Sequence, residues 1–262
     1  MADEIKQDIL DQTKGVAVEL YKDVVRPMAK PVGEILGFLP RTLKLALSGW
    51  EKWLINGEET IKLTAESVKE KIKAIPEEKL VEPEPYVAIP AMQQLSYCVN
   101  NEELRELYAN LLVSSMNADK KWQVHPAFVD IIKQLTPDEA KFIRNLQPFV
   151  SHYNALVDVR IEYDQNGSGR TIISNFTNVG LDKIDCPQNI GSYIDNLERL
   201  KLICIPPTMS LTNKDLYEPL KTHYLLTNSL PKQLGPNQKI CYDYKVFNLT
   251  NFGFDFVNIC CK

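Results

Sequence analysis

Prolines interrupt the middle of this chain, between Leu80 and Glu139, and limit the length of every helix there. A proline cannot donate the backbone hydrogen bond that a helix interior needs, so each one predicts the start or the end of a helix. The stretch therefore predicts several short helices in place of one long helix. The prolines are Pro83, Pro85, Pro90, Pro126 and Pro137.

The clearest helix pattern between these prolines runs from Glu102 to Met116. Asn100 or Asn101 can cap its start, and acidic residues in its first turn suit the positive end of a helix dipole. Its leucines recur at helical spacing, which predicts a buried stripe on one face. They are Leu104, Leu107, Leu111 and Leu112.

Two more helix starts follow along the chain. His125 and Pro126 are expected to open a helix that runs through Leu135. Thr136 then stands before Pro137, with Glu139 three residues after the threonine. Threonine as the cap, proline at the first helical position and glutamate at the third are the residues of a capping box, so a further helix is expected here.

The N-terminal part predicts helices over residues 3–30, 34–56 and about 58–75. Apolar positions recur at helical spacing in the first two, whereas the third is rich in lysine and glutamate at spacings that suit a solvated face. The second of these collects leucines and tryptophans on one face after Pro40. That face fits a core helix, and its basic flank also fits a helix lying on a membrane or against a partner. The residues of the face are Leu43, Leu47, Trp50, Trp53 and Leu54.

The pattern changes beyond residue 154. Residues 155–164 and 171–176 alternate apolar and polar positions around a glycine-rich turn, which predicts a β-hairpin. Helical spacing returns over 188–203, and the polar stretch 206–238 is expected to hold at least one short helix and some loop. The chain then closes with a strand and a helix capped near Thr250 or Asn251.

The pieces of this last part resemble the winged-helix pattern. A helix ending in LERLKLI is followed later by the strand YKVFNLT and the helix NFGFDFVNIC, in which a glycine would relieve crowding. We therefore expect an α+β fold: a mostly α-helical N-terminal and middle region followed by a winged-helix-like α+β domain. The expected division is 1–79 as amphipathic helices, 80–135 as a helical motif region, and 136–262 as the α+β domain.

Charge argues against nucleic acid as the partner. The net charge is −4, and the candidate recognition helix over 188–203 sets Arg199 and Lys201 against Asp195 and Glu198. Binding to double-stranded DNA draws much of its affinity from lysine and arginine contacts with phosphates. Because these charges are balanced here, a protein-interaction or structural role is favoured. The six cysteines have irregular spacing and no signal peptide pattern precedes them, which favours free thiols in the cytoplasm.

The middle region resembles the abortive infection alpha family of bacterial phage-defence proteins. The resemblance rests on Glu82-Pro83, Ile89-Pro90, Leu95-Ser96-Tyr97, Glu103-Leu104-Arg105, Tyr108-Ala109-Asn110-Leu111-Leu112, Met116-Asn117 and His125-Pro126-Ala127-Phe128. It covers about 60 residues closely. It implies a role in phage defence, and it implies no particular reaction.

The polar residues of this motif form a candidate site. A buried Arg105 would need a carboxylate, and Glu82 or Glu84 in the preceding connector could supply it, so that the cluster would fasten the connector to the helix. The alternative is a polar pocket for a small ligand. His125 is expected to bond backbone groups at a helix start. The candidate residues are Glu82, Arg105, Tyr108, Asn110, Asn117 and His125.

The sequence contains none of the nucleophile, phosphate-loop or dinucleotide motifs, and its histidines and cysteines lack metal-binding spacing. We therefore expect no catalytic residues, cofactor or metal. The favoured function is a non-enzymatic defence protein that acts through another macromolecule, with protein as the favoured partner and an oligomer left open. The alternatives are a toxic effector that perturbs membranes, peripheral to the inner membrane, and an enzyme with a dispersed polar site.

Overall fold

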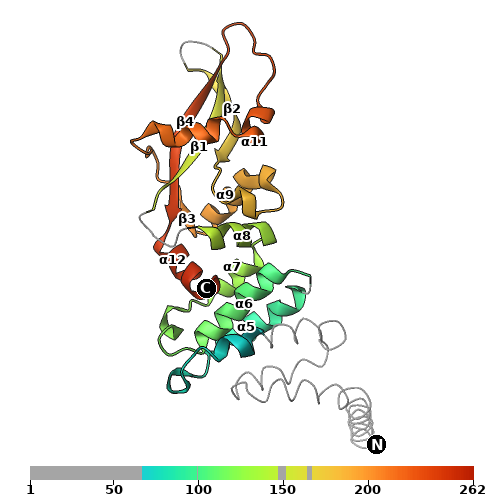
Figure 1. Cartoon of the computed structure of the whole chain (residues 1–262), viewed down its shortest axis with the longest axis vertical. Coiled ribbons are helices and arrows are strands. Elements are labelled where there is room, and N and C mark those ends of the chain that lie inside the picture. The colour runs from blue at the N-terminus through green and yellow to red at the C-terminus, as the bar shows by residue number, and fades with distance from the viewer. Residues whose placement is uncertain (1–66, 99, 147–151, 164–166) are drawn as a thin grey trace, which may run out of the picture. The chain divides into compact units, whose positions relative to one another are not determined.

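The computed structural model describes residues 67–98, 100–146, 152–163 and 167–262 (Figure 1). The predicted helices over 3–30 and 34–56, with the face that carries Trp50 and Trp53, lie outside the described residues. The chain divides into two compact units between Val129 and Asp130, inside helix α7 (Ala127–Lys133). We call them the helical unit and the sheet unit and describe each by itself.

The helical unit is built around two helices, α5 (Pro85–Leu95) and α6 (Glu102–Ser115), which contact each other. Residues 67–72 are also helical, and single 3-10 turns lie at η2 (Glu77–Lys79), η3 (Ser96–Cys98) and η4 (Lys121–Gln123). The predicted helix over 102–116 is confirmed. The core includes Leu107, Leu111 and Phe128, all fully buried.

The prediction that every proline here starts or ends a helix is wrong for Pro90, which lies inside α5. Its missing N–H leaves one helical hydrogen bond unmade, and this is a local cost. The opposing effect is the apolar face on which α5 packs, because burying apolar side chains stabilises the helix as a whole. The buried residues of α5 are Val87, Ala88, Ala91, Met92 and Leu95.

The sheet unit contains one four-stranded antiparallel sheet in the order β2-β1-β4-β3. Its strands are β1 (Asn154–Glu162), β2 (Gly169–Phe176), β3 (Ile203–Cys204) and β4 (Lys239–Leu249). The predicted hairpin and the predicted final strand are confirmed. Strand β1 pairs with β4 along nine residues, from Asn154 opposite Phe247 to Glu162 opposite Lys239, whereas β3 pairs only through its two residues.

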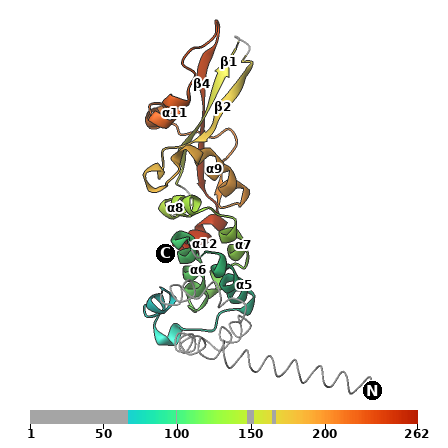
Figure 2. The same ribbon diagram turned by 90° about the vertical axis from the view of Figure 1, so that its right-hand side faces the viewer.

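The helices of this unit are α8 (Pro137–Asn145), α9 (Ile190–Arg199), α10 (Glu218–Lys221), α11 (Tyr224–Ser229) and α12 (Asn251–Cys260). Single 3-10 turns lie at η5 (Leu181–Lys183), η6 (Pro187–Asn189) and η7 (Lys214–Tyr217). Both α9 and α11 contact β2, and Figure 2 shows α11 beside the strands. Helices α10 and α11 lie in the polar stretch 206–238, so the short helix predicted there is confirmed.

The predicted helix over 188–203 is shorter in the structure, where α9 covers only Ile190–Arg199. A 3-10 turn precedes it, and Ile203 already belongs to β3. Lys201 ends the helical run because its φ of 60° is left-handed. Leu202 and Ile203 are buried although they lie beyond the end of α9. Their apolar side chains continued the helical spacing in the sequence, and this is why the predicted helix was too long.

The junction between β4 and α12 confirms the predicted cap and the predicted role of the glycine. The Thr250 hydroxyl accepts a hydrogen bond from the Gly253 amide at 2.8 Å and donates one to the Lys201 carbonyl at 2.6 Å. The Thr250 amide donates to the Leu202 carbonyl at 3.1 Å. A β-carbon at Gly253 would overlap that same carbonyl oxygen, so only glycine lets α12 approach the chain here.

The capping box predicted at the start of α8 is confirmed. The Glu139 amide donates to the Thr136 hydroxyl at 3.2 Å, and the Glu139 carboxylate accepts from the Thr136 amide at 2.6 Å. The substitution Thr136→Ala should lower the free energy of unfolding by about 1 kcal/mol, because one buried helical N–H loses its partner.

Urea denaturation checks this value, with Thr212→Ala, an exposed position between β3 and η7, as the matched control. The control should change stability by less than about 0.5 kcal/mol. Equal losses in the two variants would contradict the capping argument.

The observed architecture is α+β, as predicted. The succession of α9, β3, β4 and α12 keeps the order on which the winged-helix expectation rests, and that expectation stays a prediction.

Candidate functional site

The predicted motif residues lie in the helical unit, and their side chains differ in burial. Tyr108 is buried and donates its hydroxyl to the Val129 carbonyl at 3.1 Å. Asn110 is also buried, whereas Glu82 and His125 are exposed. The Asn117 side chain accepts from the Asp119 amide at 2.9 Å. The hydrogen bonds of Tyr108 and Asn117 therefore position backbone.

His125 bonds backbone at the start of α7, where its Nδ1 accepts from the Ala127 amide at 3.1 Å. Its ring also lies 6.0 Å from the ring of Phe128. Arg105 is half-buried on α6. Burial raises the pKa of the Cys98 thiol in η3, and the positive charge of Arg105 partly opposes that rise.

The connector 79–84 is fastened to the turn 116–121, and two lysines outside the predicted motif make the ionic contacts. Lys121 forms an ion pair with Glu84 at 2.8 Å and donates to the Glu82 carbonyl at 3.1 Å. Lys79 forms an ion pair with Asp119 at 2.6 Å. These contacts join the part of the chain before α5 to the part after α6.

Backbone hydrogen bonds complete this fastening. The Val81 amide donates to the Met116 carbonyl at 2.9 Å, and the Ala118 amide donates to the Lys79 carbonyl at 2.9 Å. Leu80 and Asn117 form an antiparallel β-bridge between them. The exposed ion pairs contribute little individually, so the backbone bonds carry most of the geometric constraint.

Large aromatic side chains are exposed beside the fastened connector. Trp122 is 77% exposed on η4, and Tyr86 is 59% exposed at the start of α5. Lys121 is the neighbour of Trp122 on η4, and its ion-pair partner Glu84 lies two residues before Tyr86. The indole N–H of Trp122 donates to the Asp119 carbonyl at 3.0 Å, so the ring is held in one orientation while its faces meet solvent. We call Tyr86 and Trp122 the aromatic pair.

Asp138 is the most densely bonded carboxylate described in the sheet unit. It is 7% exposed and accepts from the amides of Asp185 at 2.9 Å and Cys186 at 2.8 Å, and from the Tyr193 hydroxyl at 3.0 Å. Burial by itself would raise the pKa of Asp138, but the two amides and the hydroxyl outweigh it and hold that pKa below its ordinary value. Asp138 therefore links α8 to residues 185–186, which precede α9, and to Tyr193 on α9 itself.

A second polar network spans the sheet. Asn175 is buried with a left-handed φ of 55°, and its amide donates to Asp158 on β1 at 2.8 Å. Its side chain donates to Asp195 on α9 at 2.6 Å and accepts from Lys245 on β4 at 2.5 Å. Lys245 also pairs with Asp158 at 2.7 Å. The pairing register of β1 and β2 shifts beside Asp158, so this network fixes a bulge.

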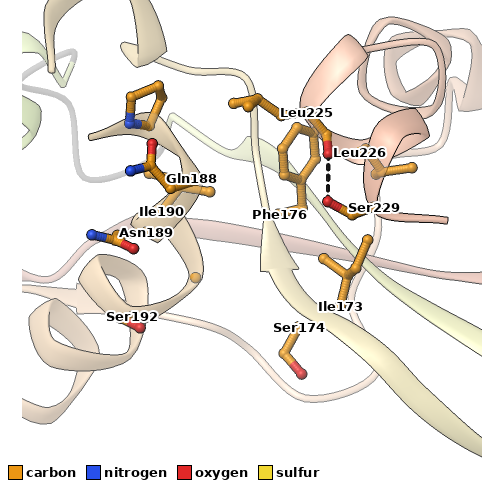
Figure 3. A pocket seen from close by; sticks show the side chains of 12 residues that line it. Ile173, Ser174, Phe176, Gln188, Asn189, Ile190, Ser192, Leu225, Leu226 and Ser229 are labelled. Atoms are coloured by element: carbon orange, nitrogen blue, oxygen red, sulfur yellow. Dashed lines mark hydrogen bonds between the residues drawn. The ribbon is translucent and has the colours of Figure 1, made fainter. Parts of the chain in front are cut away.

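A cavity of about 200 Å³ lies next to this network, between β2, the start of α9, and α11 (Figure 3). Its buried residues are Phe176, Ile190 and Leu226. Gly191 lets α9 pack closely on β2, because a β-carbon there would lie 2.7 Å from the Ser174 carbonyl oxygen. The exposed lining residues are Ser174, Gln188, Asn189, Ser192 and Ser229.

Within the described part of the chain, no three histidine, cysteine, aspartate or glutamate side chains are grouped so that they could hold a metal ion. All six cysteines are free, and Cys260 is fully buried in α12. No helix among residues 67–98, 100–146, 152–163 and 167–262 has the length and apolarity needed to span a bilayer.

The described architecture defines an α+β protein in which a helical unit with the sequence motif is followed by an antiparallel sheet unit. The family model of Abortive infection alpha matches residues 56–260, which is most of the chain. The chain therefore belongs to the abortive infection alpha family, and its role lies in the bacterial defence against phage. No curated protein and no solved structure was matched.

Proposed function

We propose that this chain acts in abortive infection without catalysing a reaction, by binding a protein partner through the aromatic pair of its helical unit. The observation that supports this proposal is Trp122, a 77% exposed tryptophan whose ring orientation is held by a hydrogen bond. Tryptophan and tyrosine are enriched among the residues that carry most of the energy of protein interfaces.

The fixed orientation matters because binding costs entropy whenever it immobilises a side chain. An exposed ring that is already held loses little on association, so its apolar area contributes to affinity with a smaller penalty. Tyr86 extends the same region, since Glu84, two residues before it, forms the ion pair with Lys121, the neighbour of Trp122. Isolated exposed apolar residues are common on proteins, and two exposed aromatic side chains on either side of one ion pair are a stronger indication of an interface.

The charges around the aromatic pair favour protein over nucleic acid. Two lysines of the connector and the turn 116–121 are paired with carboxylates, Lys121 with Glu84 and Lys79 with Asp119. A nucleic-acid surface instead presents lysines and arginines to phosphates. A protein interface suits this mixture, with an aromatic centre and a polar rim.

The substitution Trp122→Ala tests the proposal. Phage should form about ten times more plaques on a culture that expresses the variant than on one that expresses the original chain. The reason is that an interface residue of this kind commonly contributes about 2 kcal/mol or more to binding. The melting temperature should stay close to that of the original chain, since the side chain is mostly exposed and lies outside the core.

Tyr163→Ala serves as the matched control, because Tyr163 is an exposed aromatic residue of the sheet unit, 40% exposed. The control should protect as well as the original chain. Full protection by Trp122→Ala together with Tyr86→Ala would exclude the aromatic pair as the interface. A large loss of stability in Trp122→Ala would instead assign the residue to the fold.

A further inference from the structure

The outer edge of β4 extends well beyond the strand that covers it. Strand β4 pairs with β1 along residues 239–247, but β3 covers its other side only at the last two residues of β4. Pro206 and Pro207 follow β3, and a proline cannot donate a hydrogen bond to a sheet, so β3 cannot extend along β4 as a regular strand. Residues 239–247 therefore form an edge on which β3 makes no pair.

The even-numbered residues of β4 direct their backbone groups toward this edge. On the β3 side, the Thr250 amide donates to the Leu202 carbonyl at 3.1 Å. Successive residues of a paired strand direct these groups to opposite sides, and β4 keeps one register with β1 throughout. Ile240, Tyr242 and Tyr244 therefore point their N–H and C=O groups away from β1. Within the described part of the chain, no backbone hydrogen bond from outside the sheet reaches these groups.

A second copy of β4 is complementary to this edge. When two copies run antiparallel about a two-fold axis at Cys241, Lys239 faces the partner's Asp243, and Ile240 faces the partner's Tyr242. The two-fold axis makes each of these pairs twice. Opposite charges, and pairs of an aromatic with a β-branched residue, stabilise neighbouring strands, so both contacts favour this register.

The charged residues of this contact are accessible in a single chain. The Lys239 side chain is 65% exposed, and that of Asp243 is 49% exposed. Lys239 pairs with Glu162 at 2.9 Å, and Asp243 lies 3.8 Å from Arg160. A charge at a sheet edge can share two partners, so pairing with a second copy extends these ion pairs without breaking them.

Neighbouring registers are less favourable than the one centred on Cys241. An axis one residue further along β4 places Lys239 opposite the partner's Lys245, and an axis two residues further places Asp243 opposite the partner's Asp243. An axis three residues further drives the partner strand against β3. An axis one residue earlier separates Lys239 from the partner's Asp243. An axis between residues is excluded, because it would oppose a residue pointing outward to one pointing inward.

We propose that this chain forms a homodimer in which the β4 edges of two copies pair antiparallel about Cys241. The two four-stranded sheets then join into one continuous sheet, held by main-chain hydrogen bonds as in other strand additions. Exposed edges of this kind are prone to pairing unless they are blocked, and here the charges that could block the edge match across the two-fold axis. The interface lies in the sheet unit and is independent of the aromatic pair.

The first test is sedimentation velocity on the full chain over a range of concentrations, with two variants of opposite sign. Asp243→Lys opposes lysine to lysine across the axis, and Lys239→Glu opposes glutamate to aspartate. Each variant alone should raise the dissociation constant of the dimer at least tenfold. An equal mixture of the two should restore dimers, because each mixed dimer again pairs lysine with a carboxylate at both contacts.

Glu78→Lys and Lys133→Glu are the matched controls, because they make the same charge changes at exposed positions of the helical unit and of α7. Both should dimerise as the original chain does. Circular dichroism checks folding of every variant, and restoration by mixing is a result that a misfolded variant cannot give. A chain that stays monomeric at high micromolar concentration would overturn the proposal, and so would a dimer that neither variant weakens or that mixing fails to restore.

The second test uses the cysteine at the axis. Opposed residues that exchange no backbone bonds in an antiparallel pair have Cα atoms about 4.5 Å apart, within the range that a disulfide spans. Diamide, which takes up the two hydrogens of the thiols as the disulfide forms, should therefore give a covalent dimer on a non-reducing gel. The band should be absent in Cys241→Ser and kept in Cys204→Ser, whose residue is also a free thiol. A covalent dimer that persists in Cys241→Ser would refute the register.

Discussion

The substitution Gly253→Ala should lower the free energy of unfolding of the sheet unit by about 3 kcal/mol, the largest effect that we expect from adding one methyl group. The new β-carbon would overlap the Leu202 carbonyl oxygen, which belongs to the backbone and has no flexible end that could move aside. That carbonyl also accepts the Thr250 amide at 3.1 Å, so displacing α12 would also weaken the hydrogen bond that joins its N-cap residue to Leu202.

Chemical denaturation followed by far-ultraviolet circular dichroism measures this loss. Gly235→Ala is the matched control, because its β-carbon would meet only the Gln238 side chain, at 3.2 Å, and moving that side chain costs at most its hydrogen bond from the Gly235 amide at 2.8 Å. The control should stay within about 1 kcal/mol of the original chain. If Gly253→Ala proved as stable as Gly235→Ala, the close approach of α12 to Leu202 would be refuted.

The substitution Asp138→Asn should also cost about 3 kcal/mol, since hydrogen bonds to a charged acceptor are stronger than neutral ones and buried donors lose a partner. Asparagine keeps one accepting oxygen and replaces the other with a donor. One of the three donors to Asp138 must then go unbonded, or face an N–H group. The donors are the amides of Asp185 and Cys186 and the hydroxyl of Tyr193.

The pH dependence of this loss follows from the lowered pKa of Asp138. A carboxyl group whose pKa lies lower in the folded than in the unfolded chain stabilises the fold fully above the unfolded value. That stabilisation is lost as the pH falls through the folded pKa. The stability difference between the original chain and Asp138→Asn should therefore be constant well above pH 3.8 and shrink below it.

Urea denaturation at a series of pH values checks both the size and the pH dependence. Asp130→Asn on α7 is the control, because this carboxylate is exposed. It should change stability by less than about 0.5 kcal/mol. A difference between Asp138→Asn and the original chain that failed to narrow at acid pH would show that the charge of Asp138 contributes nothing.

Local patterns predicted the elements of the sheet unit well. The cap at Thr136, the cap at Thr250 and the glycine at position 253 each act within a few residues of chain, and all three are confirmed. The predicted hairpin is also confirmed. Strand β1 buries Val157, Val159 and Ile161 at alternate positions, but Leu156 is buried as well and β2 shows no alternation of burial. Sequence reasoning succeeds where the deciding interaction is close along the chain.

The remaining features depend on residues far apart in the sequence. The bond between Lys245 and Asn175 joins positions 70 residues apart, and no spacing rule brings them together. Lys121 and Glu84 likewise meet only after α5 and α6 have packed. Pro90 shows the reverse effect, since tertiary burial of α5 outweighs a local helix-breaking preference. The cavity was not predicted because three separate elements form it.

The fastening of the connector also affects how the helical unit opens. Backbone bonds from Val81 to Met116 and from Ala118 to Lys79 close a loop of chain at its base, and that loop contains α5 and α6. Closing a loop restricts the conformations open to everything within it. The two helices are therefore expected to unfold as one cooperative segment, and a force on the chain before Lys79 would reach the closed base of this loop before it reached either helix.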